Sequence, residues 1–173
     1  MTKNNAAGVF SVAIGLVLIP GLLSAHHSEA LLDKNSATTV TGTVTKWAFS
    51  NPHPAINLDG DVKDSQGKTV NWFAAGGGGV LGLSKAGWTN KTLAAGDRIL
   101  VQGEQVKDGR PVMGLRKLYR CDGKEVPVGY EADESKSKKF EPLSPERVRE
   151  LCAKGVVLGV IKPELFASAE GAK

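Results

Sequence analysis

Histidine is the residue type in this sequence best suited to bind a metal, and it occurs only three times. His26 and His27 follow an apolar N-terminal segment, and His53 lies in the turn Asn51-Pro52-His53-Pro54. If the chain is cut after Ala25, the free amine and the imidazole of His26 form a bidentate nitrogen chelate. Copper(II) prefers nitrogen ligands in a square-planar or tetragonal arrangement, so these residues predict a copper site with His27 or His53 as a further ligand. The alternative is that His26 and His27 belong to an exposed terminus and that His53 only caps a turn.

Residues 1–25 have the features of a secretory signal peptide. Lys3 is the only charged residue among them, an apolar run follows it, and Ala25 is a small residue at the exit. The run is shorter than the roughly 20 residues that a membrane-spanning helix needs, and Pro20-Gly21 interrupts it, so an uncleaved anchor is the less favoured alternative. We therefore expect a periplasmic protein, cleaved after Ala25, with no stable membrane insertion afterwards.

The charge of the exported chain does not favour a nucleic-acid partner. The full chain has 22 Lys+Arg against 18 Asp+Glu, and loss of Lys3 leaves 22 − 1 = 21 against 18, a net charge of +3. The basic stretch Arg116–Arg120, if it lies on a strand of an OB barrel, could bind oligonucleotides. Export and the scarcity of aromatic residues argue against that function. Because Cys121 and Cys152 are the only cysteines of an exported chain, we expect them to form a disulfide.

The order of the predicted elements favours a mainly β protein: a small five-stranded OB-like barrel over residues 38–122, preceded by an N-terminal segment of residues 26–37. Alternation of apolar and polar residues, with turn residues between the runs, predicts five strands at residues 38–47, 55–62, 68–74, 97–102 and 111–119. In the first strand, Thr41, Thr43 and Thr45 should face solvent. A short helix over residues 80–86 separates the third and fourth strands. A small β-sandwich is the alternative fold.

Two further features near the barrel admit a structural or a functional interpretation. Trp47 and Phe49 precede the His53 turn, where they either line a shallow pocket or belong to the core. The glycine tract at residues 76–79 lacks the Gly-Lys-Ser/Thr ending of a phosphate-binding loop, so we interpret it as a connection between strand and helix.

After the barrel, the sequence predicts a charged linker at residues 123–143 and a helical extension at residues 144–173. Ser144 as capping residue and Pro145 at the first helical position predict a helix that runs to Lys154 and stops at Gly155. The predicted disulfide would then tie this helix to the end of the last strand.

Several short motifs, in order, resemble a family of small secreted proteobacterial proteins of unknown function. They are an export signal ending in Ala-His-His-Ser, Thr41-Gly42-Thr43-Val44, Ser50-Asn51-Pro52-His53, Val70-Asn71-Trp72, Ala86-Gly87-Trp88-Thr89 and Leu93-Ala94-Ala95-Gly96-Asp97. The resemblance covers about residues 20–120. It implies a periplasmic location and an OB-like barrel, supplies no activity, and does not extend to the tail that begins at Lys124.

Taken together, the sequence favours a periplasmic binding protein rather than an enzyme. It contains no nucleophile motif such as Gly-x-Ser-x-Gly, so we assign no catalytic residue and no cofactor other than the candidate copper ion. The partner is a small ligand, a metal or another envelope protein. The competing hypothesis is an interaction module that uses the barrel face or the C-terminal tail, and a copper enzyme is a third, less favoured one.

Overall fold

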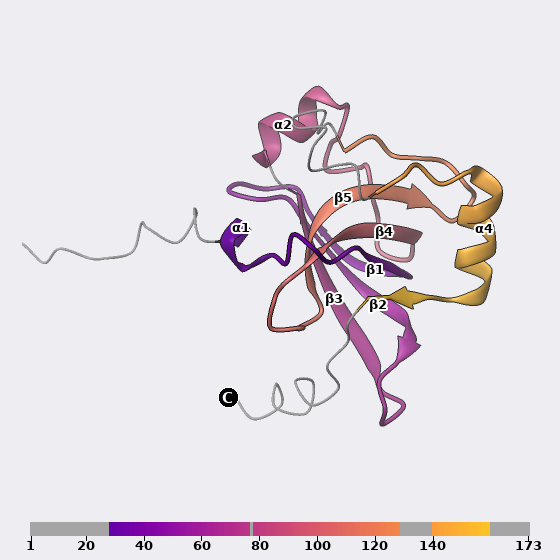
Figure 1. Ribbon diagram of the computed structural model, residues 1–173. Helices are drawn as coiled ribbons and strands as arrows, with labels where there is room; N and C mark the ends of the chain where they lie inside the picture. Colours follow the sequence, from indigo (N-terminus) through magenta and orange to yellow (C-terminus); the bar gives the residue numbers. More distant parts are fainter. Residues whose placement is uncertain (1–27, 77, 129–139, 160–173) are drawn as a thin grey trace, which may run out of the picture.

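The computed structural model describes residues 28–76, 78–128 and 140–159, and its centre is a closed barrel of five strands (Figure 1). The strands are β1 (Thr38–Ala48), β2 (Ala55–Lys63), β3 (Thr69–Gly76), β4 (Arg98–Gln105) and β5 (Val112–Arg120). Around the barrel they follow the order β1-β2-β3-β5-β4 and return to β1. The β3–β5 pair is parallel, and the other four pairs are antiparallel. This closed arrangement confirms the predicted OB-like barrel over the alternative sandwich.

The short helix predicted between the third and fourth strands is α2 (Gly79–Lys85). It starts after Gly78, whose left-handed backbone (φ 70°) suits glycine. Leu83 points from this helix into the barrel and is only 1% exposed, so α2 closes one end of the core. The described part of the glycine tract therefore connects strand to helix, as the sequence predicted. Over the described ranges, no helix is long and apolar enough to cross a membrane.

The barrel interior is built from alternate residues of the five strands. On β1, Val40 and Val44 point inward, and Gly42 lies between them where a Cβ would come within 2.3 Å of the Asp59 carbonyl oxygen. Burial of a Val, Leu or Ile side chain stabilises the fold by about 1.5–3 kcal/mol. The strand residues of this core are Val40, Val44, Ile56, Leu58, Val70, Trp72, Ala74, Ile99, Val101, Met113, Leu115 and Leu118.

The prediction that the threonines of the first strand face solvent is wrong for its N-terminal half. Thr45 is exposed, but Thr41 is fully buried and Thr39 is 7% exposed. The reason is a sixth strand, β6 (Val157–Leu158), which pairs antiparallel with β1 at Thr39 and Val40. The Thr41 amide also donates to the Val156 carbonyl at 3.0 Å, and its hydroxyl accepts from the Val156 amide at 2.8 Å.

The predicted C-terminal helix is confirmed as α4 (Pro145–Lys154). The Ser144 hydroxyl accepts from the Arg147 amide at 3.2 Å, and Gly155 ends the helix with φ 66°. The disulfide between Cys121 and Cys152 is present and joins α4 to the end of β5. An apolar cluster, formed by Leu100, Tyr119, Val148, Leu151 and Cys152, lies between α4 and the outer face of β4 and β5.

The described parts of the predicted charged linker contain buried residues. Val128 and Phe140 are 7% and 3% exposed. The Val126 amide donates to the Leu118 carbonyl at 2.8 Å, and Glu125 forms an antiparallel bridge with Tyr119 of β5. The strongly charged part of this segment falls at residues 129–139, which lie outside the described residues.

Candidate functional site

The three candidate metal ligands fall on two segments of the chain. His26 and His27 lie outside the described residues, immediately before Ser28, where helix α1 (Ser28–Leu31) begins. His53 is partly exposed in the turn between β1 and β2, where the Asn51-Pro52 peptide bond is cis. The Pro54 carbonyl accepts from the Gly76 amide at 2.8 Å, so this turn is held against the end of β3.

The N-terminal segment is fixed to the barrel by main-chain hydrogen bonds; we call residues 30–33 with their contacts the N-terminal anchor. The Lys107 amide donates to the Leu31 carbonyl at 2.9 Å, and the Asp33 amide donates to the Gln105 carbonyl at 2.8 Å. Leu32 and Val106 form an antiparallel bridge between these bonds. The Lys107 ammonium also donates to the Ala30 carbonyl at 2.9 Å. The anchor therefore sets where the chain that follows His27 meets the β4–β5 hairpin.

A continuous row across the sheet connects the anchor with the His53 turn. Leu32 lies over Gly114 of β5, Gly114 pairs with Ala75 of β3, and Ala75 pairs with Ala55 of β2, two residues after His53. Neighbouring strands lie about 4.8 Å apart, so Gly114 and Ala55 are separated by about 10 Å. In Figure 1, α1 and the turn between β1 and β2 project from the same side of the barrel.

The two aromatic residues before the turn belong to the rim of the core. The Trp47 ring centroid lies 5.6 Å from that of Phe49 and 5.3 Å from that of Trp88. Trp88 is buried, whereas Trp47 and Phe49 are partly buried and pack against the core. The Trp47 indole donates to the Thr89 carbonyl at 3.0 Å. Of the two interpretations open from the sequence, the structure favours the core, and the cluster stiffens the end of β1 before the His53 turn.

The basic stretch at the end of the last strand is largely neutralised by carboxylates. Arg116 donates through Nε to Glu104 at 2.8 Å, and the Glu104 side chain is 3% exposed. Lys117 and Arg120 lie 3.2 and 3.3 Å from Glu125 and Asp97. These three cationic side chains therefore form ion pairs with carboxylates of the same chain.

The described residues do not form a metal centre by themselves. Among them, no three histidine, cysteine, aspartate or glutamate side chains gather in a way that could hold an ion. Both cysteines are committed to the disulfide. Of the three predicted ligands, only His53 lies within the described residues, so the structure does not test whether the three histidines meet.

The residues of the N-terminal anchor were not identified from the sequence. Leu31, Leu32 and Asp33 show no alternation that predicts a strand, and their contacts to the hairpin are mostly made by main-chain atoms. The one local signal is Asp108-Gly109, which predicts the hairpin turn but not what docks on it.

Residues 16–116 match the model of a family of unknown function (DUF6152). The chain belongs to this family. Membership confirms that the motifs noted in the sequence point to an uncharacterised family. No curated protein matches the chain. The matched range includes all three histidines and Leu32, and it ends within β5, before Cys121, α4 and β6.

Proposed function

We propose that this DUF6152 member is a non-catalytic copper(II)-binding protein of the periplasm, with the amine and imidazole of His26 as the terminal chelate and His53 as a third nitrogen ligand. One observation carries the proposal beyond the sequence. The N-terminal anchor contacts Gly114 of β5 through Leu32. Gly114 pairs with Ala75, which pairs with Ala55, two residues after His53.

The available chain length permits the two segments to meet. Helix α1 has four residues and spans about 6 Å, and the two residues before it span at most about 7 Å. His53 is two residues from Ala55, which gives at most about 7 Å more. The combined length of these three segments exceeds the separation of about 10 Å between Gly114 and Ala55.

The chemistry favours copper(II) among first-row metals. Nitrogen donors in a tetragonal arrangement suit this ion, and the disulfide leaves no thiolate to favour copper(I). An amine and two imidazoles bind only when they are unprotonated, so binding should weaken as the pH falls through the imidazole range near about 6.5. Since the sequence lacks a nucleophile motif, we assign the site to binding rather than to catalysis.

The decisive experiment compares two forms of the exported protein, one that begins at His26 and one with an added alanine before it. Sequencing of the N-terminus first checks the cut after Ala25. Calorimetric titration with copper(II), against a competing chelator, should show weaker binding by the extended form on the order of 100-fold, which corresponds to about 2.7 kcal/mol. His53→Ala should weaken binding by about tenfold, or 1.4 kcal/mol. His27→Ala tests the alternative further ligand and should have a smaller effect than His53→Ala. Equal affinities of the native and extended termini would overturn the proposal.

The second candidate function is an envelope interaction module that uses the barrel face. It is supported by Phe73, an aromatic side chain 38% exposed on the outer face of β3, since OB barrels bind ligands over strands 2 and 3. Site-specific cross-linking in the periplasm from position 71, an exposed position on the same face of β3, would trap such a partner. Loss of that product in Phe73→Ser, with copper binding unchanged, would favour this function over the first.

A further inference from the structure

We infer that the edge of β1 at residues 39–41 is a strand-addition site for an extended peptide of a partner protein, and that β6 occupies this site as an internal ligand. β1 pairs with β4 over residues 38–43, but its pairing with β2 begins only at Gly42. The side of β1 opposite β4 is therefore left open before Gly42, and β6, the arrow that follows α4 in Figure 1, pairs with it there. A strand edge of this kind presents main-chain donors and acceptors that an extended chain can pair with.

β6 has fewer attachments than the rest of the extension. The disulfide and the buried side chains of the apolar cluster hold the chain as far as Cys152, and Gly155 ends α4. Beyond that point the chain is attached to β1 by the hydrogen bonds of Val156 and by the two residue pairs of β6. Leu158 is 50% exposed. These few contacts allow β6 to leave the edge while α4 stays in place, as the exchange of an internal for an external strand requires.

The strand register gives a ligand strand one apolar and one polar position. Directly opposed residues of paired strands point to the same face of the sheet. Val157 lies opposite Val40, a core residue, and packs against that core. Leu158 lies opposite Thr39, so its side chain is on the outer face. The first position therefore suits a β-branched apolar residue, and the second lies beside a hydroxyl group.

The polar position contains a buried oxygen that β6 leaves without a partner. Gln102 of β4 also lies opposite Thr39, so Gln102, Thr39 and Leu158 form a row across the outer face. Gln102 is 8% exposed, and its Nε2 donates to the Thr39 hydroxyl at 3.2 Å. Its Oε1 has no hydrogen-bond partner within the described part of the chain. Buried polar atoms are normally paired, and a leucine side chain cannot pair this one. β6 therefore fits the apolar position of the site but not the polar one.

The chemistry of the row defines the peptide that fits better. A side-chain amide at the position of Leu158 can donate to Gln102 and can also accept, and glutamine has the length to reach past Thr39. The peptide is therefore an extended segment in which valine or isoleucine is followed by glutamine. The surroundings are polar as well, because the buried polar and charged side chains of the described residues all lie on β1 and β4. They are Thr38, Thr39, Thr41, Gln102, Glu104 and Gln105.

The test uses the full chain with Leu158→Pro, because proline has no main-chain donor for the ladder and so weakens β6 without changing α4. Two synthetic peptides are titrated into it: residues 155–159, Gly-Val-Val-Leu-Gly, and the same peptide with Leu158→Gln. Both should shift the NMR amide resonances of residues 39–41. The glutamine peptide should bind about fivefold more tightly, as one added hydrogen bond gives. The matched control adds Gln102→Met, which keeps the length of the side chain without the amide, and should bind the two peptides equally.

A second measurement keeps the ligand strand in the chain and does not depend on the affinity of a short peptide. Leu158→Gln, at this exposed position, should hold β6 more firmly on the edge. The Thr41 amide, which donates to the Val156 carbonyl, should then exchange with solvent about fivefold more slowly than in the native chain. The difference should disappear when Gln102→Met is added.

The outcomes are distinct from those of the copper experiment. Equal binding of the two peptides by the Leu158→Pro chain, or shifts confined to other residues, would overturn the inference. Unchanged exchange of the Thr41 amide in Leu158→Gln would overturn it as well, and this variant also decides the case if Leu158→Pro fails to fold. If Leu158→Pro sediments as a dimer, the edge pairs with a second copy of the chain and the partner peptide is wrong. None of these results changes the copper titrations, which depend on His26 and His53.

Discussion

The two segments that dock on the outside of the barrel are attached in different ways. The N-terminal anchor consists mainly of main-chain hydrogen bonds to the β4–β5 hairpin and one apolar contact, Leu32, while its neighbour Leu31 is 53% exposed. The C-terminal extension, residues 140–159, adds a ten-residue helix, a buried apolar cluster, a disulfide and a strand on the edge of β1. The first attachment consists of a few contacts over residues 30–33, whereas the second buries an apolar cluster and includes a covalent bond.

This difference suggests a division of roles. The family match includes the anchor and the histidines, and it ends before the extension begins. The extension covers the Thr39–Thr41 edge of β1, and a covered edge cannot pair with another chain. We therefore expect changes in the extension to alter stability with little effect on copper binding, and changes in the anchor to do the reverse.

The largest expected effect is the loss of the disulfide. The bond closes a loop with a sequence separation of 31, for which the chain-entropy account gives about 3–4 kcal/mol. Cys121→Ser combined with Cys152→Ser should lower the free energy of unfolding by that amount in urea denaturation. Copper affinity at the N-terminus should stay within about twofold. A parallel loss of copper affinity would show that the two segments are coupled and would break the comparison.

The next effect is expected from the apolar cluster under α4. Leu151 is 5% exposed, and its replacement by alanine should cost about 2–4 kcal/mol, because it removes buried methyl groups and leaves a cavity. Leu158→Ala, at a position that is 50% exposed, is the matched control and should change stability by less than about 0.5 kcal/mol. Similar effects at the two positions, measured by thermal or urea unfolding, would mean that the helix is not held by this cluster.

The sequence predicted the elements whose signals are local. The alternation in β1, the Ser144-Pro145 start of α4 and its stop at Gly155 each depend on residues a few positions apart. The disulfide followed from the number of cysteines and the expected compartment. These features needed no knowledge of how distant segments pack.

The sequence did not predict contacts between distant segments. Alternation shows that Thr41 lies opposite the core face, but not that Val156, 115 residues later, covers it. The two residues of β6 are too few for any periodicity, and the anchor is held by main-chain atoms, which carry no side-chain pattern. At the candidate site, His53 lies in the predicted turn, whereas the row from Leu32 to Ala55 emerges only from strand register.

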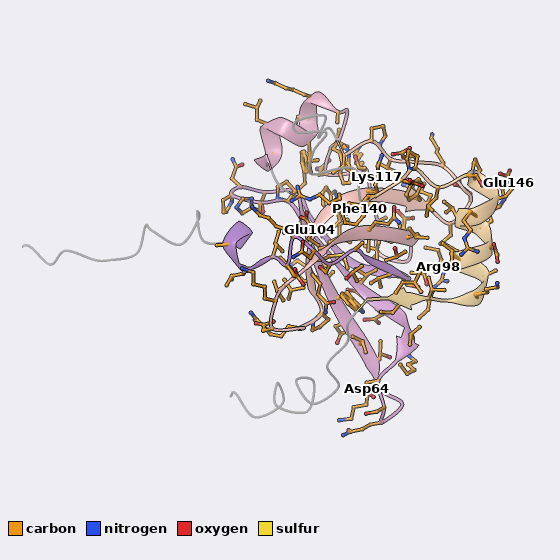
Figure 2. All side chains as sticks on the ribbon, viewed as in Figure 1. Asp64, Arg98, Glu104, Lys117, Phe140 and Glu146 are labelled. Carbon is orange, nitrogen blue, oxygen red and sulfur yellow. A yellow bond between two sulfur atoms is a disulfide. The ribbon has the colours of Figure 1, made fainter. Side chains whose placement is uncertain are left out.

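A smaller, pH-dependent effect is expected where the extension meets the barrel through an ion pair. Arg98 donates through Nη2 to Asp61 at 2.9 Å and to the Cys152 carbonyl at 3.2 Å, and Figure 2 shows Arg98 beside α4. Burial raises the pKa of Asp61, but hydrogen bonds from Arg98 and Thr41 and the charge of Arg98 outweigh it, so the pKa is lowered. Because the pKa is lowered in the folded state, the stabilisation by the Asp61–Arg98 pair is fully present above the ordinary aspartate pKa, about 3.9. This stabilisation is lost as the pH falls through the folded-state pKa.

We therefore expect the urea concentration at the unfolding midpoint, measured at pH 7, 5, 4 and 3, to decrease less with falling pH for Asp61→Asn than for the native protein. Glu150→Gln is the comparison variant on the exposed face of α4. Lys154 and Arg147 lower the pKa of Glu150 to about 2. Solvent screens these exposed ion pairs, so removal of the Glu150 charge should change the pH profile less. Parallel profiles for Asp61→Asn and the native protein would show that the Asp61–Arg98 pair does not contribute to holding the extension.

The smallest stability effect is expected at the anchor. Lys107→Met keeps the main-chain donor to Leu31 and most of the side chain, and removes only the ammonium that donates to the Ala30 carbonyl. Because Lys107 is exposed, the free energy of unfolding should change by less than about 0.5 kcal/mol. The same variant loosens helix α1, which follows His27, so copper affinity should fall by a few fold. A urea titration and a copper titration of the same variant measure the two effects. A destabilisation above about 1 kcal/mol would mean that the anchor, like the extension, contributes to the stability of the barrel. A segment held by a few exposed contacts can lose one of them with little change in the free energy of unfolding, whereas a segment that is part of the core cannot.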